Sequence, residues 1–133
     1  MHNRPTHFEI HASDPERAAK FYTDVFGWTI TKWDSPAMEY WVVMTAPTGS
    51  DAAGGDGGLL RRHGAAPVGG EAVNAYVVTI QVDNYDATHD KIMTAGGTVA
   101  LPKMALAGMA WQGYYKDLEG NIFGLHQTDK EAK

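Results

Sequence analysis

The strongest constraint on the fold is an internal repeat, in which the second half of the chain follows the first at an offset of 70 residues. Four pairs of positions align without gaps: Ser13 with Asp83, Glu16 with Asp86, Tyr22 with Ile92, and Gly27 with Gly97. In each half, one strand-like segment precedes the helix and three follow it. Such a unit has an apolar face to bury, and pairing two units into a curved sheet buries it. The repeat therefore predicts an α+β fold of two βαβββ modules.

The helix of the first half has clear boundary signals. Either Ser13 caps it with Glu16 reaching back, or Asp14 caps it with Pro15 at the first helical position. The apolar residues at helical spacing are Ala18, Phe21, Tyr22, Val25 and Phe26. Gly27 is then the expected C-terminal cap.

In the second half, Asp83 is the expected helix cap and Gly96 with Gly97 the expected end. Segments rich in β-branched and aromatic residues predict strands at 6–11, 28–33, 39–45 and 59–62, and then at 75–82, 98–104, 108–115 and 121–127. The predicted organisation is one domain over residues 1–133, with module 1 at about 1–62, a Gly/Pro-rich linker at 63–74 and module 2 at 75–133.

Composition excludes several classes of function. The absence of cysteine rules out disulfides, thiolate metal sites and a cysteine nucleophile. A net charge of −5 argues against binding nucleic acid through its phosphates. No apolar run is long enough for a signal peptide or a membrane span. We therefore expect a cytoplasmic protein with no nucleic-acid or membrane partner.

The segment HFEIH at residues 7–11 carries the most conspicuous polar cluster. On a strand, His7, Glu9 and His11 share one face, and the alternating residues face the other way. His7 and His11 would lie roughly 13 Å apart, too far for both to bind one ion. The three side chains therefore predict the polar floor of a pocket, with Glu9 as a candidate general base. Hydrogen bonding on a partly wet sheet face is the alternative role.

Three stretches carry a resemblance to a known family: DPERAAKFYTDVFGW at 14–28, GGTVALPKM at 96–104 and KDLEGNIFGL at 116–125. With the paired βαβββ order, they resemble the vicinal-oxygen-chelate superfamily of glyoxalase I, bleomycin-resistance proteins and extradiol dioxygenases. The similarity is greatest to bacterial glyoxalase-like proteins. The resemblance implies a cup-shaped mixed sheet with helices outside, and a homodimer.

Metalloenzymes of that superfamily hold a divalent ion in the cup, and the resemblance places their ligand positions in this chain. The first falls on His7, which is a proper ligand, whereas the next two fall on Val77 and Gly124, which are not. The remaining position lies near 42–44, which offers no strong ligand. Catalytic zinc generally has three protein ligands. We therefore expect no cofactor, with a divalent metal (Zn, Ni, Mn or Fe) at His7 and substitute ligands as the alternative.

Aromatic and polar residues on the strands supply the remaining pocket candidates. The full predicted set is His7, Glu9, His11, Tyr40, Met44, Trp111, Tyr115 and His126. For the aromatic members, sheet–helix packing or a dimer interface is the alternative role.

Two functions follow from these predictions. The first is a bleomycin-resistance-like protein that binds a small apolar or aromatic metabolite or drug without a complete metal site. The second is a glyoxalase-like lyase or isomerase, or a dioxygenase-type enzyme, acting through a metal at His7 or through Glu9 as a base. Whether the chain is an enzyme stays open at this point.

Overall fold

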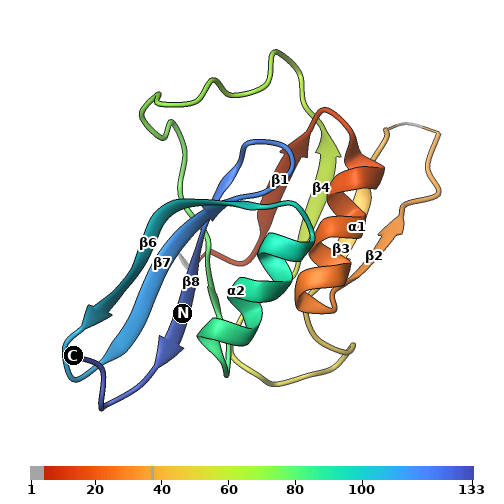
Figure 1. Cartoon of the computed structure of the whole chain (residues 1–133). Helices are drawn as coiled ribbons and strands as arrows, with labels where there is room; N and C mark the ends of the chain where they lie inside the picture. The colour runs from red at the N-terminus through yellow and green to blue at the C-terminus, as the bar shows by residue number, and fades with distance from the viewer. Residues whose placement is uncertain (1–4, 37) are drawn as a thin grey trace. The chain divides into compact units, whose positions relative to one another are not determined.

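The computed structural model describes residues 5–36 and 38–133. The chain divides into two compact units, Met1–Ala66 and Pro67–Lys133. Each unit contains one four-stranded mixed sheet and one helix, in the order strand, helix, three strands. Figure 1 shows this order in colour along the chain. The predicted α+β fold with two βαβββ units is confirmed, and each sheet is open, with two edge strands.

The first unit is built from β1 (Phe8–Ala12), α1 (Pro15–Phe26), β2 (Thr29–Lys32), β3 (Trp41–Met44) and β4 (Gly57–Arg61). Its strand order is β1-β4-β3-β2, with β1 parallel to β4 and the other pairs antiparallel. β4 starts two residues before its predicted position, because Gly57 and Gly58 pair with Phe8 and Glu9.

The structure decides between the two caps that the sequence allowed for α1. The Asp14 side chain accepts a hydrogen bond from the backbone N–H of Arg17 at 3.2 Å, and Pro15 is the first helical residue. At the other end, Gly27 has a φ of 73°, and its N–H donates to the carbonyl of Thr23 at 2.9 Å. Glycine adopts this left-handed conformation without the steric cost of a side chain.

α1 packs against one face of the first sheet (Figure 1). Tyr22 from the helix stacks on Trp28 with ring centroids 5.2 Å apart, and Trp28 also contacts Phe8 of β1. The buried apolar residues of this unit are Ile10, Ala12, Ala18, Phe21, Tyr22, Val25, Trp28, Trp41, Val43 and Leu59. Burial of each large side chain contributes about 1.5–3 kcal/mol, so this layer holds the helix on the sheet.

The second unit is built from β5 (Thr79–Gln81), α2 (Tyr85–Thr94), β6 (Thr98–Leu106), β7 (Ala110–Lys116) and β8 (Ile122–Thr128). Its strand order, β5-β8-β7-β6, repeats that of the first unit, with β5 parallel to β8. β5 is shorter than the predicted 75–82, because this edge strand pairs with β8 through three residues alone. β6 continues past its predicted end to Leu106.

The cap of α2 differs from the sequence prediction by one residue. Asn84, and not Asp83, accepts the hydrogen bond from the backbone N–H of Ala87, at 3.0 Å. Asn84 lies 70 residues after Asp14, the observed cap of α1, so the repeat offset holds for the residues that cap both helices. Among the described residues, no helix is long and apolar enough to cross a membrane.

Candidate functional site

In the first unit, α1 covers one face of the sheet and leaves the other, here called its helix-free face, to the polar residues of β1. Ile10 and Ala12 are buried toward the helix, whereas Glu9 and His11 are exposed on the opposite face. Strand pairing places Gly58 and Val42 on the same face as Glu9. The predicted alternation along HFEIH is therefore confirmed.

Tyr40 and His7 form a fixed pair on this face. The Nε2 atom of His7 lies 2.8 Å from the hydroxyl of Tyr40. The Tyr40 ring lies over Gly58, where a Cβ would come within 1.8 Å of the hydroxyl oxygen. Burial and the nearby charge of Glu9 raise the pKa of Tyr40. Because the Tyr40 hydroxyl keeps its proton at neutral pH, it can act as a hydrogen-bond donor.

Glu9 and His11 form a second contact on the same face. The His11 Nε2 and Glu9 Oε1 atoms lie 3.3 Å apart, and both side chains are nearly half exposed, at 45% and 46%. An exposed pair of this kind contributes little to stability. Its carboxylate is accessible to a bound molecule, so this pair can take part in proton transfer.

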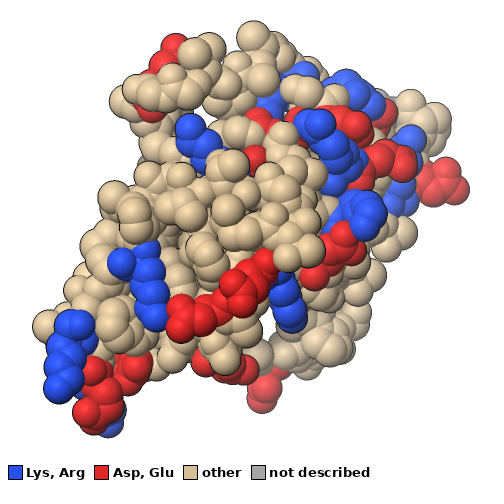
Figure 2. Space-filling view, in the orientation of Figure 1, with Lys and Arg blue, Asp and Glu red and all other residues tan. Residues whose placement is uncertain are grey.

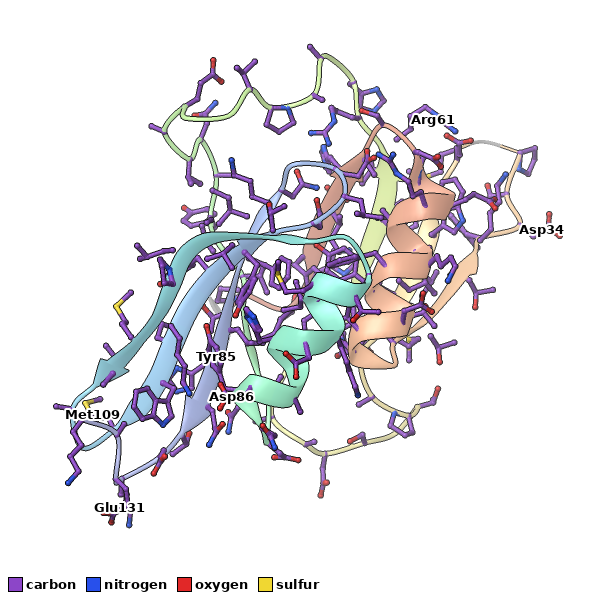
Figure 3. All side chains as sticks on the ribbon, viewed as in Figure 1. Asp34, Arg61, Tyr85, Asp86, Met109 and Glu131 are labelled. Atoms are coloured by element: carbon purple, nitrogen blue, oxygen red, sulfur yellow. The ribbon has the colours of Figure 1, made fainter. Side chains whose placement is uncertain are left out.

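Two further groups lie at the ends of the two inner strands of the first sheet. Met44 lines a shallow hollow of about 380 Å³ with Gly27, Thr29 and residues 45–48, and this hollow does not include His7 or Glu9. Arg61, at the end of β4 in Figure 3, binds Glu39 through two contacts at 2.8 and 3.3 Å. Hydrogen bonding to Arg61 lowers the pKa of Glu39.

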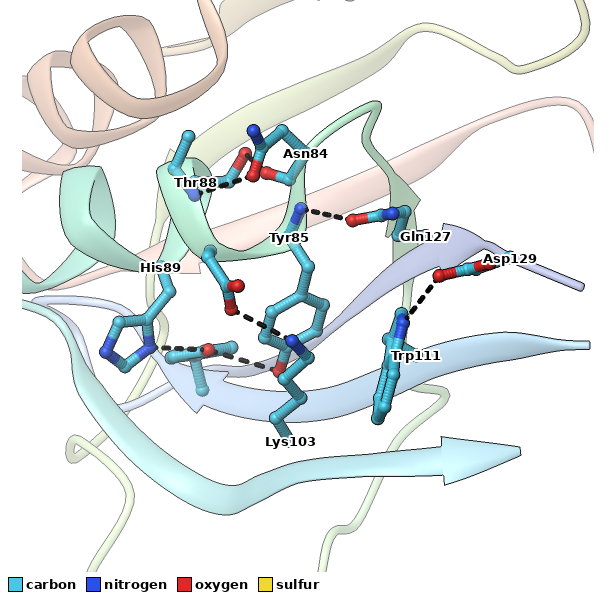
Figure 4. A network of polar contacts seen from close by, with 11 residues as sticks. Asn84, Tyr85, Thr88, His89, Lys103, Trp111, Gln127 and Asp129 are labelled. Carbon is cyan, nitrogen blue, oxygen red and sulfur yellow. Dashed lines mark hydrogen bonds and ion pairs between the residues drawn. The ribbon is translucent and has the colours of Figure 1, made fainter. Parts of the chain in front are cut away.

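Trp111 and Tyr115 lie on the face of the second sheet that α2 covers. Tyr115 is 1% exposed, and its hydroxyl contacts His89 Nδ1 at 2.8 Å and Tyr85 at 3.1 Å (Figure 4). Trp111 donates its indole N–H to Asp129 at 2.9 Å, and the ammonium of Lys103 lies 4.4 Å from its ring centroid. Tyr115 is therefore buried against α2, whereas Trp111 contacts Lys103 of β6 and Asp129 after β8.

His126 lies on the opposite face of the second sheet, as its separation of two residues from Gly124 predicted. Its Nδ1 atom is 2.6 Å from Oε1 of Gln112, which is 7% exposed. Thr79 on the neighbouring strand pairs with Gly124. Gln112 and Thr79 are not among the predicted pocket residues, although the repeat offset relates Thr79 to Glu9 and alternation places Gln112 on the same face as Tyr114.

The donor atoms within each unit do not fit a divalent metal centre. Nε2 of His7 is engaged by the Tyr40 hydroxyl, and Val77 and Gly124 have no ligand atoms in their side chains. Within the described part of the chain, no three His, Cys, Asp or Glu side chains form a group that could hold an ion. The contacts that these residues make within each unit are hydrogen bonds.

Basic and acidic side chains are mixed on the surface that Figure 2 draws. Figure 2 shows basic and acidic side chains in small mixed groups on the face in view, without a continuous basic patch there. This distribution agrees with the net charge of −5. A nucleic-acid interface would need lysines and arginines clustered on one face.

Sequence comparison relates the chain to one family model and to curated relatives. Residues 4–46 match the bleomycin resistance protein-like N-terminal family. The chain is 27% identical over 127 residues to the glyoxylase-named protein CFP32 of Mycobacterium bovis, and 26% identical over 125 residues to the anthracycline biosynthesis protein DnrV of Streptomyces peucetius. These alignments cover 95% and 91% of this chain. The chain spans about half the length of these curated relatives, 46% in each case.

Solved structures share the fold. A glyoxalase/bleomycin resistance protein/dioxygenase family enzyme from Burkholderia phytofirmans PsJN matches with a TM-score of 0.69 at 14% identity, covering 93% of this chain and 98% of that one. A glyoxylase/bleomycin resistance protein/dioxygenase domain from Frankia sp. EAN1pec matches with a TM-score of 0.72 at 12% identity, covering 98% and 94%. With the paired βαβββ units, these likenesses show that the chain has the fold of the glyoxalase/bleomycin-resistance/dioxygenase (vicinal-oxygen-chelate) proteins and is similar to them in sequence.

Proposed function

We propose that this protein binds a small apolar or aromatic molecule on the helix-free faces of its sheets, without requiring a metal. The observation that carries the proposal is the Tyr40–His7 pair seated on Gly58. It fixes an aromatic ring and a polar group beside apolar side chains that remain partly exposed, such as Val42 at 37%. Binding sites for small molecules combine a mostly apolar lining with a few placed polar groups.

The names of the relatives support a small-molecule ligand. One relative is named for anthracycline biosynthesis and another as a glyoxylase, and both names concern the chemistry of small molecules. Neither name identifies the ligand of this chain, so the proposal is limited to the class of molecule.

Thermal unfolding with a panel of planar naphthalene and anthracene sulfonates tests the proposal. A ligand that binds the native state alone stabilises it by about 2.7 kcal/mol at about 100 times its Kd, which raises Tm by several degrees. We expect Tyr40→Ala to reduce this rise, measured against the Tm of the same variant without ligand. Met109→Ala, at an exposed turn residue of the second unit, is the control. The proposal fails if no member of the panel raises the Tm of the natural sequence.

A glyoxalase-like lyase or isomerase is a second candidate function, with Glu9 as general base. The observation that favours it is the half-exposed Glu9 carboxylate, which lies close enough to Tyr40 to raise the pKa of that hydroxyl. In a glyoxalase assay, Glu9→Gln should then abolish turnover and leave ligand binding unchanged. Turnover that survives in Glu9→Gln would contradict this role.

Metal content separates the metal-free proposal from its metal-dependent alternative. We expect elemental analysis of protein purified without chelators to find far less than one equivalent of Zn, Ni, Mn or Fe. A stoichiometric metal that disappears in His7→Ala would overturn the metal-free proposal, because His7 occupies the ligand position that matches the superfamily.

We also propose a homodimer. β6 is an edge strand of nine residues, and it exposes Val99, Leu101 and Leu106. Exposed edges of this length favour pairing with another chain. Light scattering coupled to size exclusion should give twice the 14.5 kDa chain mass, and a monomer across the micromolar range would contradict the proposal.

A further inference from the structure

We propose that the second unit contains a subsite for a carbonyl oxygen, at the position where the side chains of Thr79 and Gln112 both lie close over Gly124 of β8. We call this position the Gly124 notch. The inference rests on the proposed binding of a small molecule to the helix-free faces, and it adds the chemical group that the second unit recognises. It requires neither a metal nor the Glu9 carboxylate.

Three side chains converge above Gly124. A Cβ at this position would lie 2.6 Å from Oγ1 of Thr79, 3.0 Å from Nε2 of Gln112 and 3.2 Å from Cε1 of Tyr114. Gly124 therefore occupies a point in the strand where two hydrogen-bonding groups and one ring edge approach the backbone. A small group on a ligand can approach these two donors without meeting a side chain at residue 124.

Gln112 is held with its amide nitrogen unused. The side chain is 7% exposed, and its Oε1 is fixed by Nδ1 of His126 at 2.6 Å. Among the described residues, the Gln112 Nε2 group has no hydrogen-bond acceptor, and no fully buried side-chain nitrogen or oxygen lacks a partner. Nε2 therefore keeps access to the surroundings. A mostly buried donor without a protein partner gains from an acceptor supplied by a ligand.

In the first unit, Gly58 is the position that corresponds to Gly124, and there a side chain of the protein itself supplies and satisfies the hydrogen-bonding group. Val42 pairs with Gly58 in the first sheet, and Tyr114 pairs with Gly124 in the second. Two residues before each of these pairing residues come Tyr40 in the first unit and Gln112 in the second, so Tyr40 corresponds to Gln112. Tyr40 places its own hydroxyl over Gly58, where His7 satisfies it.

In the second unit, the residue that corresponds to His7 at the repeat offset is Val77, which cannot hydrogen-bond through its side chain. The donor over Gly124 is consequently left for another molecule.

The chemistry of the notch favours a neutral acceptor. A glutamine Nε2 group is a donor, and a threonine hydroxyl can donate as well. Neither group is charged, so neither provides the charge-assisted hydrogen bonds that strengthen the binding of an anion. The fitting group is the carbonyl oxygen of a ketone, quinone or amide on an otherwise apolar or aromatic molecule.

Calorimetric titration with a matched pair of probes tests this inference. Anthraquinone-2-sulfonate and anthracene-2-sulfonate share a three-ring body and one anionic group, and they differ in the two ring carbonyls. We expect the quinone to bind about threefold to tenfold more tightly, the factor that one net hydrogen bond supplies. Thr79→Val and Gln112→Leu should each reduce that preference and leave the Kd of anthracene-2-sulfonate unchanged.

Two controls keep the result interpretable. Thr98→Val makes the same substitution at an exposed residue at the start of β6, and it should keep the preference. Thr79 is exposed, so Thr79→Val decides the question if Gln112→Leu fails to fold.

In a nitrogen–proton correlation spectrum, the side-chain amide of Gln112 should shift with the quinone and not with anthracene-2-sulfonate.

The possible failures are distinct. If both probes bind with the same Kd and the variants change neither, the Gly124 notch is not a carbonyl subsite, while the proposed function stands. If the natural sequence binds neither probe, that result contradicts the proposed function for this ligand class and the inference with it.

Discussion

The hydroxyl oxygen of Tyr85 in α2 lies directly over Gly113 in β7, 1.9 Å from where a Cβ on that glycine would be. The first turn of the helix therefore rests on bare backbone in the middle of the sheet. Figure 3 labels Tyr85 and Asp86 at the start of α2. Because the helix and strand approach so closely here, this contact fixes the position of α2 in the second unit.

Gly113→Ala should therefore lower the free energy of unfolding. The added methyl group would force Tyr85 out of its position, and overpacking of this kind costs about 1–3 kcal/mol. Urea denaturation should show a lower midpoint at an unchanged slope. Gly64→Ala is the matched control, because nothing lies within 4 Å of its Cβ position. Equal midpoints for both variants would contradict the contact.

Tyr115→Phe tests the hydroxyl network beneath α2. The substitution removes the hydroxyl that contacts both Tyr85 and His89, and it leaves the buried Tyr85 hydroxyl and the half-buried His89 ring without this partner. We expect a loss of about 1–3 kcal/mol, because a polar group buried without a hydrogen bond loses its solvation. Phe123→Leu, at a neighbouring buried ring of β8, indicates how much of the loss comes from packing alone.

The same network predicts a loss of stability at alkaline pH. Burial raises the pKa of the Tyr115 hydroxyl, and its hydrogen bond with Tyr85 raises it further. Above about pH 10, the unfolded chain releases this proton while the folded chain retains it. The unfolded state then binds fewer protons, so the free energy of unfolding falls as pH rises. Denaturation between pH 8 and 11 should show a shallower fall in Tyr115→Phe than in the natural sequence.

The helix caps predict a pair of matched stability effects. Asp14→Ala and Asn84→Ala should each cost about 1 kcal/mol, because each removes the acceptor for an N–H in the first helical turn. Ser13→Ala should cost less, since Ser13 is not the cap of α1. Chemical denaturation of the three variants measures the difference. A larger loss for Ser13→Ala than for Asp14→Ala would show that the other cap operates in solution.

Acid should release Trp111 from Asp129. Hydrogen bonds from the Glu131 backbone and from the Trp111 indole lower the pKa of Asp129. The bonds persist at neutral pH and weaken as pH falls through the lowered pKa, because protonation removes the charge on the acceptor. Tryptophan fluorescence should change in this acidic range for the natural sequence, and this change should be absent in Asp129→Asn and in Trp111→Phe.

The repeat and the alternation of β1 could be predicted because each rests on residues with one clear preference. In FEIHA, apolar and polar side chains alternate, so the buried face follows directly from strand geometry. The repeat offset likewise relates both helices and both caps. The Asp83 prediction failed by one residue because Ser13, the wrong alternative in the first half, was used as the reference.

The faces of β7 could not be predicted in the same way. Its sequence AWQGYYK places an aromatic residue on each face, so alternation alone does not say which face α2 covers. That choice depends on Tyr85 fitting over Gly113, a contact between residues 28 positions apart in the chain. The proximity of Gln112 and Thr79 could not be predicted either, because it arises from the pairing of β7, β8 and β5 and not from local sequence.

The Tyr40 ring over Gly58 has a consequence for how this site can evolve or be redesigned. Any single substitution of Gly58 places a side chain where the ring already lies, so the first viable step has to change Tyr40 as well. Residues 40 and 58 therefore have to change together. Restoring Tyr40 while residue 58 keeps a side chain would make the two side chains clash. A combinatorial library that varies the two positions together can reach pocket chemistries that saturation of either position by itself will miss.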